Sequence, residues 1–74
     1  MNTRNDWENL LNLANEELGK KGYALNIFKD EEWYYSCDIL KDGKVIENYA
    51  EGFYENELSE LITDAWHYVI ANFI

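Results

Sequence analysis

Two segments of the chain carry apolar residues at the spacing of an α-helix. Residues 6–19 and 57–72 each place an apolar side chain every three or four positions, so each predicts a helix with one buried face. Thr3 or Asn5 is expected to cap the first helix and Asn56 the second, because short polar side chains accept hydrogen bonds at helix starts. The positions that define the two faces are Trp7, Leu10, Leu11, Ala14 and Leu18, then Leu58, Leu61, Ile62, Ala65, Trp66, Val69, Ile70 and Phe73.

Between the helices lie three segments that alternate in polarity or are rich in aromatic and β-branched residues. Residues 23–29, 33–40 and 45–53 therefore predict three strands. Asp42-Gly43 is the strongest short hairpin signal available, because a tight turn needs residues that tolerate positive φ. The order predicts an α+β domain, αβββα, in which a three-stranded antiparallel meander carries two helices on one face.

A two-residue turn at Asp42-Gly43 also fixes a register for the last two strands. The expected pairs are Leu40–Val45, Ile39–Ile46, Asp38–Glu47 and Cys37–Asn48. Because side chains alternate between faces, the helices should cover Trp33, Tyr35, Cys37, Ile39, Ile46 and Ala50. The open face should then carry Tyr34, Ser36, Asp38, Leu40, Val45, Glu47, Tyr49 and Glu51. Trp7, Trp33 and Trp66 are expected to form one core cluster.

Residues 1–74 are expected to form a single domain. Its charge limits the classes of partner that it is expected to bind. The net charge is −9, and residues 45–74 contain six carboxylates but no lysine or arginine. Such a charge repels nucleic-acid phosphates and anionic membranes. No segment has the pattern of a signal peptide or a transmembrane helix. The single cysteine allows no intramolecular disulfide, and a cytoplasmic protein is expected.

The acidic residues form two predicted rows, of which the first lies on the open sheet face. Asp38 and Glu47 should face each other across the strands, with Glu51 extending the row, although like charges in such positions are destabilising. One interpretation is a solvated face whose carboxylates prevent aggregation. The other is a partner-binding face on which Tyr34 and Tyr49 act as aromatic anchors.

The second row follows the C-terminal helix, where Glu57, Glu60, Asp64 and His67 share one stripe, with Glu55 at the junction of the two rows. This stripe is either a solvent-facing surface or a line of negative charge that imitates a phosphate backbone. Metal binding by its last three members is a further interpretation, against which stand the single histidine and the absence of a glycine-rich oxygen loop. We expect neither a metal nor another cofactor.

Catalysis has little support in the sequence. The chain has no nucleophile-elbow, phosphate-loop or Cys-x-x-Cys motif. Cys37 is expected on the apolar sheet face and His67 on the far side of a helix, so the two do not predict a nucleophile–base pair. We therefore expect no enzyme, and Cys37 should be a small buried hydrophobe.

In size, acidity and element order, the whole chain resembles the small inhibitors that phages and other mobile elements carry. These families include anti-restriction proteins and the DNA-mimicking class of anti-CRISPR proteins. No sequence motif takes part in the resemblance, so it assigns no residue a role. It implies an inhibitor that occupies a basic DNA-binding groove, in the cytoplasm of the host cell where a phage encodes it.

We therefore expect a non-enzymatic acidic protein that occupies a basic nucleic-acid-binding surface of a partner, such as a CRISPR effector or a restriction enzyme, and inhibits it by DNA mimicry. The alternative is a homo-oligomeric structural or accessory protein that pairs through Tyr34, Leu40, Val45 and Tyr49, so monomer and homodimer both stay open. The residues expected to bind the partner are Asp38, Glu47, Glu51, Glu55, Glu57, Glu60, Asp64, Tyr34 and Tyr49.

Overall fold

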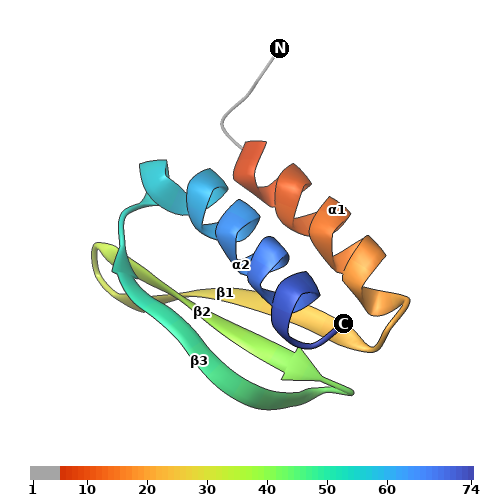
Figure 1. The fold of residues 1–74 in the computed structure, drawn as a ribbon. Helices are drawn as coiled ribbons and strands as arrows, with labels where there is room; N and C mark the ends of the chain where they lie inside the picture. The colour runs from red at the N-terminus through yellow and green to blue at the C-terminus, as the bar shows by residue number, and fades with distance from the viewer. Residues whose placement is uncertain (1–5) are drawn as a thin grey trace.

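The predicted elements are all present, in the order αβββα. A computed structural model describes residues 6–74, so the predicted caps Thr3 and Asn5 lie outside the described residues. The elements are α1 (Asp6–Gly19), β1 (Tyr23–Glu31), β2 (Tyr34–Lys41), β3 (Lys44–Phe53), a short 3-10 helix η1 (Glu55–Glu57) and α2 (Leu58–Asn72). The strands form an antiparallel sheet in the order β1-β2-β3, and both helices cover the same face of it (Figure 1). The predicted α+β meander is therefore confirmed.

The core lies between the two helices and the inner face of the sheet. Its buried members are Ala14 and Leu18 of α1, Leu25, Cys37 and Ile39 of the sheet, and Leu58, Leu61, Ile62, Ala65 and Val69 of α2. Trp7 and Trp66 pack against this cluster, as predicted. Trp33 does not, because it occupies the turn between β1 and β2, where its side chain is 67% exposed. The predicted cluster of three tryptophans is therefore wrong for Trp33.

Helix α1 also covers part of one edge of the sheet, through a single side chain. The side-chain amide of Asn15 in α1 accepts a hydrogen bond from the Leu25 N–H at 2.7 Å and donates one to the Leu25 carbonyl at 3.1 Å. These bonds satisfy backbone groups of the edge strand β1 that would otherwise be open to pairing.

Neither helix of residues 6–74 has the length and apolarity needed to cross a membrane.

The turn between β2 and β3 has the predicted form. Asp42 and Gly43 have φ angles of 53° and 85°, as a two-residue hairpin turn of this type requires. Leu40 opposes Val45, which confirms the first predicted pair. The predicted cap of the last helix is wrong, because Asn56 lies inside η1. Glu57 precedes α2 instead, and its Oε1 accepts a hydrogen bond from the Tyr54 N–H at 2.9 Å.

Beyond its first pair, β3 departs from the predicted register. The pairing shifts between Leu40 and Ile39, between Asp38 and Cys37, and between Cys37 and Tyr35, and at each shift β3 contributes one residue more than β2. The observed pairs are Ile39–Glu47, Asp38–Asn48, Cys37–Ala50 and Tyr35–Phe53. The predicted pairs Ile39–Ile46, Asp38–Glu47 and Cys37–Asn48 are therefore wrong. The cause is a β-bulge at each shift: an extra unpaired residue on β3 changes which of the following side chains point toward the helices and which point away from them.

Cys37 lies in the core with 0% of its surface exposed, which confirms the prediction of a small buried hydrophobe. Burial raises the pKa of its thiol from 9.0 to about 12, and the charge of Asp38 adds to the rise. Because the folded-state pKa exceeds the unfolded value, the stability linked to this thiol is complete below pH 9.0 and is lost as the pH rises toward about 12.

We predict that Cys37 does not react with a disulfide reagent such as DTNB at about pH 8 while the protein is folded, because only an accessible thiolate reacts. The control is the same chain in concentrated urea, which should react as fast as free cysteine. The urea midpoint of the wild-type protein should fall above pH 9.0, and that of Cys37→Ala should fall less. Rapid labelling of the native protein would contradict the buried position.

Candidate functional site

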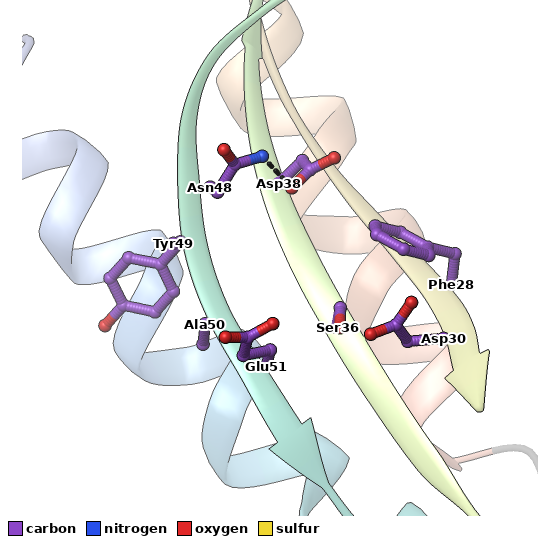
Figure 2. A pocket seen from close by; sticks show the side chains of 8 residues that line it. All are labelled: Phe28, Asp30, Ser36, Asp38, Asn48, Tyr49, Ala50 and Glu51. Atoms are coloured by element: carbon purple, nitrogen blue, oxygen red, sulfur yellow. Dashed lines mark hydrogen bonds between the residues drawn. The ribbon is translucent and has the colours of Figure 1, made fainter.

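The predicted row of acids on the open sheet face is divided between two faces. Asp38 and Glu51 lie on the outer face, away from the helices, as predicted (Figure 2). Glu47 and Tyr49 instead turn toward α2, because the bulges place Glu47 opposite the buried Ile39 and leave Tyr49 as an extra residue. The predicted row Asp38–Glu47–Glu51 is therefore wrong, and so is the assignment of Tyr49 to the outer face.

Glu47, Tyr49 and Tyr68 meet where α2 lies against β3. Together with Asp64, one helical turn before Tyr68 in α2, we call this group the α2–β3 edge. The Tyr68 hydroxyl donates a hydrogen bond to Glu47 Oε2 at 2.8 Å, and the rings of Tyr49 and Tyr68 lie 4.9 Å apart. This hydrogen bond raises the pKa of Tyr68. Burial raises the pKa of Tyr49, and the charges of Asp64 and Glu47 add to that rise. The charge of one carboxylate from each predicted row thus raises the pKa of the same tyrosine.

The predicted stripe on α2 continues from this edge along the helix surface. Glu60, Asp64 and His67 are exposed on the side of α2 away from the core, as predicted. Glu55 and Glu57 are exposed just before the helix, although Glu57 also closes the helix entry through its bond to Tyr54. Within residues 6–74, no three His, Cys, Asp or Glu side chains form a group that could hold a metal ion.

The outer face of the sheet contains a hollow of about 550 Å³. All three strands contribute to it, and we call it the outer-face hollow: Phe28 and Asp30 from β1, Ser36 and Asp38 from β2, and Asn48, Tyr49, Ala50 and Glu51 from β3 (Figure 2). Tyr49 borders the hollow although its ring points toward α2 (Figure 2). The small Ser36 forms its floor, because it pairs with the large Phe28 on one side. Three carboxylates therefore surround one serine.

Of two polar side chains that line this hollow, Asn48 makes a hydrogen bond within it and Ser36 makes none among the described residues. Asn48 Nδ2 donates to Asp38 Oδ1 at 3.0 Å and so holds that carboxylate in place. Ser36 is 4% exposed, and its hydroxyl has no hydrogen-bond partner among the described residues. A buried hydroxyl without a partner is uncommon in folded proteins and calls for an explanation.

Aromatic side chains collect at one end of the outer face. Tyr34 lies 5.2 Å from Tyr54, ring centre to ring centre, and its neighbour Trp33 projects from the adjoining turn. A smaller hollow of about 180 Å³ lies beside Tyr34 and shares Asp30 and Glu51 with the larger one. Tyr34 and Tyr49, the two predicted anchors, are therefore on different faces.

Few of the carboxylates are neutralised. Of the fifteen in the chain, two lie within 4 Å of a lysine in residues 6–74: Glu17 near Lys20 at 3.4 Å and Asp42 near Lys41 at 3.8 Å. Three others accept hydrogen bonds from neutral donors, namely Asp38 from Asn48, Glu47 from Tyr68 and Glu57 from the Tyr54 N–H. These bonds orient the carboxylates without cancelling their charge.

Sequence reasoning missed part of this arrangement. Phe28, Asp30 and Asn48 were not expected at a site, because their meeting depends on the pairing of three strands. The available signal was Ser36, a small polar residue that directly follows three aromatic residues, Trp33, Tyr34 and Tyr35. Comparison of the chain with protein-family models, with curated protein sequences and with solved structures finds no match. What the site does must therefore be argued from its geometry.

We predict that Tyr68→Phe lowers the urea midpoint of unfolding, because it leaves the half-buried Glu47 without its donor. The same substitution should cost less in a Glu47→Ala background, where the acceptor is already gone. Tyr49→Phe is the matched control, since the Tyr49 hydroxyl has no hydrogen bond within residues 6–74, and it should change the midpoint little. An equal loss from Tyr68→Phe in both backgrounds would show that the bond contributes nothing.

Proposed function

We propose that this protein is a non-enzymatic acidic inhibitor that acts in the cytoplasm by occupying a basic nucleic-acid-binding surface of a partner. The most specific version of the partner is a CRISPR effector nuclease, with a restriction enzyme next. Lysine and arginine side chains that normally meet phosphates would instead meet carboxylates, and the DNA duplex would be excluded. The host-cell cytoplasm is the proposed location where a phage encodes the chain.

One observation carries this proposal: within residues 6–74, three carboxylates are oriented by neutral donors, whereas two lie near a lysine. Glu47 and Asp38 each accept a hydrogen bond from an uncharged side chain, so their negative charge stays available to a partner. Asp64 and Glu60 extend the charge along α2, one helical turn apart. Solubility requires a net charge, but it does not require that the charged side chains be held in a fixed orientation.

This mechanism makes binding dependent on salt. Charges that meet across an interface steer association, and mobile ions screen them over roughly 10 Å at 0.1 M salt. The net charge of −9 is large for 74 residues, so attraction to a basic groove should be felt before contact. Association should therefore be fast at low salt and much slower at high salt.

We predict that Glu60→Lys with Asp64→Lys weakens competition with a fluorescent DNA duplex for a CRISPR nuclease by roughly tenfold or more, since each attractive pair becomes a repulsive one. The matched control is Glu8→Lys with Glu16→Lys, which makes the same change of charge on exposed positions of α1. It should retain most of the competition. The duplex and the nuclease are kept constant, and the salt concentration is varied.

Three outcomes decide this proposal. Competition that only the α2 variant loses supports a specific acidic surface. Equal loss in both variants indicates an effect of net charge alone and contradicts mimicry by a defined surface. Competition that is indifferent to salt, or unchanged in the α2 variant, contradicts the mechanism altogether. Glu57 is left unchanged because it closes the entry to α2.

A homo-oligomeric structural protein is the second candidate, and one observation favours it. Val45 and Ile46 on β3 are 53% and 45% exposed, and β3 is the edge strand that Asn15 does not close. Against it, the predicted contact residues do not form one patch, because Tyr49 faces α2 while Leu40 and Val45 lie at the turn end of the hairpin.

We predict a monomer of 8.8 kDa in sedimentation equilibrium, at low and at high salt, because the unpaired carboxylates repel a second copy. A stable dimer at high salt, where repulsion is screened, would favour the second candidate. In that case Val45→Lys should restore the monomer, whereas Leu13→Lys, at an exposed apolar position of α1, should not.

A further inference from the structure

We propose that the outer-face hollow is a binding site for an arginine side chain presented by a protein partner. This inference rests on the proposed function only in that the partner is basic. It concerns the face of the sheet opposite to the α2–β3 edge, and it assigns a ligand chemistry to residues that the sequence did not bring together.

The first reason is the unpartnered hydroxyl of Ser36. It lies on the floor of the hollow, 4% exposed, with no hydrogen-bond partner in residues 6–74. Burying a hydroxyl without a partner costs stability, so such a group is expected where a ligand supplies the missing bond. Ser36 Oγ has almost no exposed surface, so a donor that enters the hollow must displace part of the lining to use this oxygen as an acceptor.

The second reason is the arrangement of charge around that floor. Asp30, Asp38 and Glu51 come from three different strands, and the hollow has no lysine or arginine in its lining. The only amide in the lining, Asn48, donates to Asp38 and leaves the charge of that carboxylate in place. The site therefore offers acceptors from several directions and attracts a cation that carries several donors.

The third reason is the match to arginine rather than lysine. A guanidinium group is planar and presents five N–H donors in a fixed fork, whereas an ammonium group is a compact point charge. A guanidinium also stacks on aromatic rings, and Phe28 forms one wall of the hollow. The volume of about 550 Å³ exceeds the need of one ion and lies within the usual range of ligand sites, about 300–1,000 Å³.

The surroundings suit a peptide segment as the carrier of that arginine. The smaller hollow continues the outer-face hollow toward Tyr34 through the shared Asp30 and Glu51. Tyr34, which lines the smaller hollow, and Tyr54, whose ring lies 5.2 Å from that of Tyr34, offer aromatic side chains at this end. An extended basic segment would place an arginine over Ser36 and a neighbouring residue against the aromatic end, where tyrosine and tryptophan commonly anchor interfaces.

The test uses nitrogen-15-labelled protein and two probes of equal charge, a hexa-arginine and a hexa-lysine peptide. We expect hexa-arginine to bind roughly fivefold more tightly and to shift the amide signals of Phe28, Ser36, Asp38 and Asn48 most. Ser36→Ala should weaken hexa-arginine binding by roughly threefold while the urea midpoint stays equal or rises, because an unpartnered hydroxyl has been removed. The spectrum of each variant shows whether it is folded.

Two variants that remove the same charge locate the site. Asp38→Asn with Glu51→Gln alters the hollow, and Glu60→Gln with Asp64→Asn alters the stripe on α2. The first should weaken hexa-arginine binding by roughly tenfold and the second by less than about twofold. Equal binding of both peptides, equal loss in both variants or shifts spread over all acidic surfaces would overturn the proposal and leave general charge attraction.

The two proposals fail separately. If the DNA competition assay fails but hexa-arginine still prefers the hollow, mimicry is wrong and the arginine site stands. If competition holds while hexa-arginine shows no preference over hexa-lysine, the arginine site is wrong and the proposed function stands.

Discussion

The course of β3 decides where the acidic side chains of this protein lie. In a regular strand Glu47, Tyr49 and Glu51 would share one face, because side chains alternate. The bulges interrupt that alternation, so Glu47 pairs with Ile39 and faces α2, while Asn48 takes its place opposite Asp38. An edge strand with bulges also presents an irregular row of backbone groups, which disfavours pairing with another sheet. Both acidic surfaces and the hollow depend on this one strand.

Local signals in the sequence were sufficient for the elements and their order. The apolar face of α2, that of α1 and the Asp42-Gly43 turn each depend on residues within one element. The structure confirms all three, except that Ile70 and Phe73 at the end of the predicted α2 face are 47% and 37% exposed. The bulges were not predictable in the same way. Gly52, with φ of 83°, marks one of them, but Ile46 and Tyr49 have side chains that suit a regular strand equally well. Trp33 was misplaced because an apolar residue in a turn fits the pattern of the strand that follows it.

The candidate site could likewise be predicted only in part, because its residues come from elements that are far apart in the sequence. The stripe of Glu60 and Asp64 follows from helical spacing and was predicted. Its meeting with Glu47 around Tyr49 depends on how α2 lies across β3, which no local pattern encodes. The outer-face hollow needs the register of three strands at once: Ser36 becomes a floor only when Phe28 is placed opposite it. Sequence therefore indicated that acidic groups mattered, whereas tertiary structure determined which of them are neighbours.

The hydrogen bonds to the carboxylates separate two explanations of the charge. A lysine beside Glu47 or Asp38 would fix the carboxylate but cancel its charge, whereas a phenol or an amide fixes it and leaves the charge intact. Groups that are already oriented lose less conformational freedom on binding, so such carboxylates suit contact with a cation in a defined place. Glu47 lies on the open edge strand β3 and faces α2, whereas Asp38 lies on the central strand β2 and faces the other side of the sheet. Under the proposed function, a basic cleft that receives β3 between its walls could contact both, as it would contact the two backbones of a duplex.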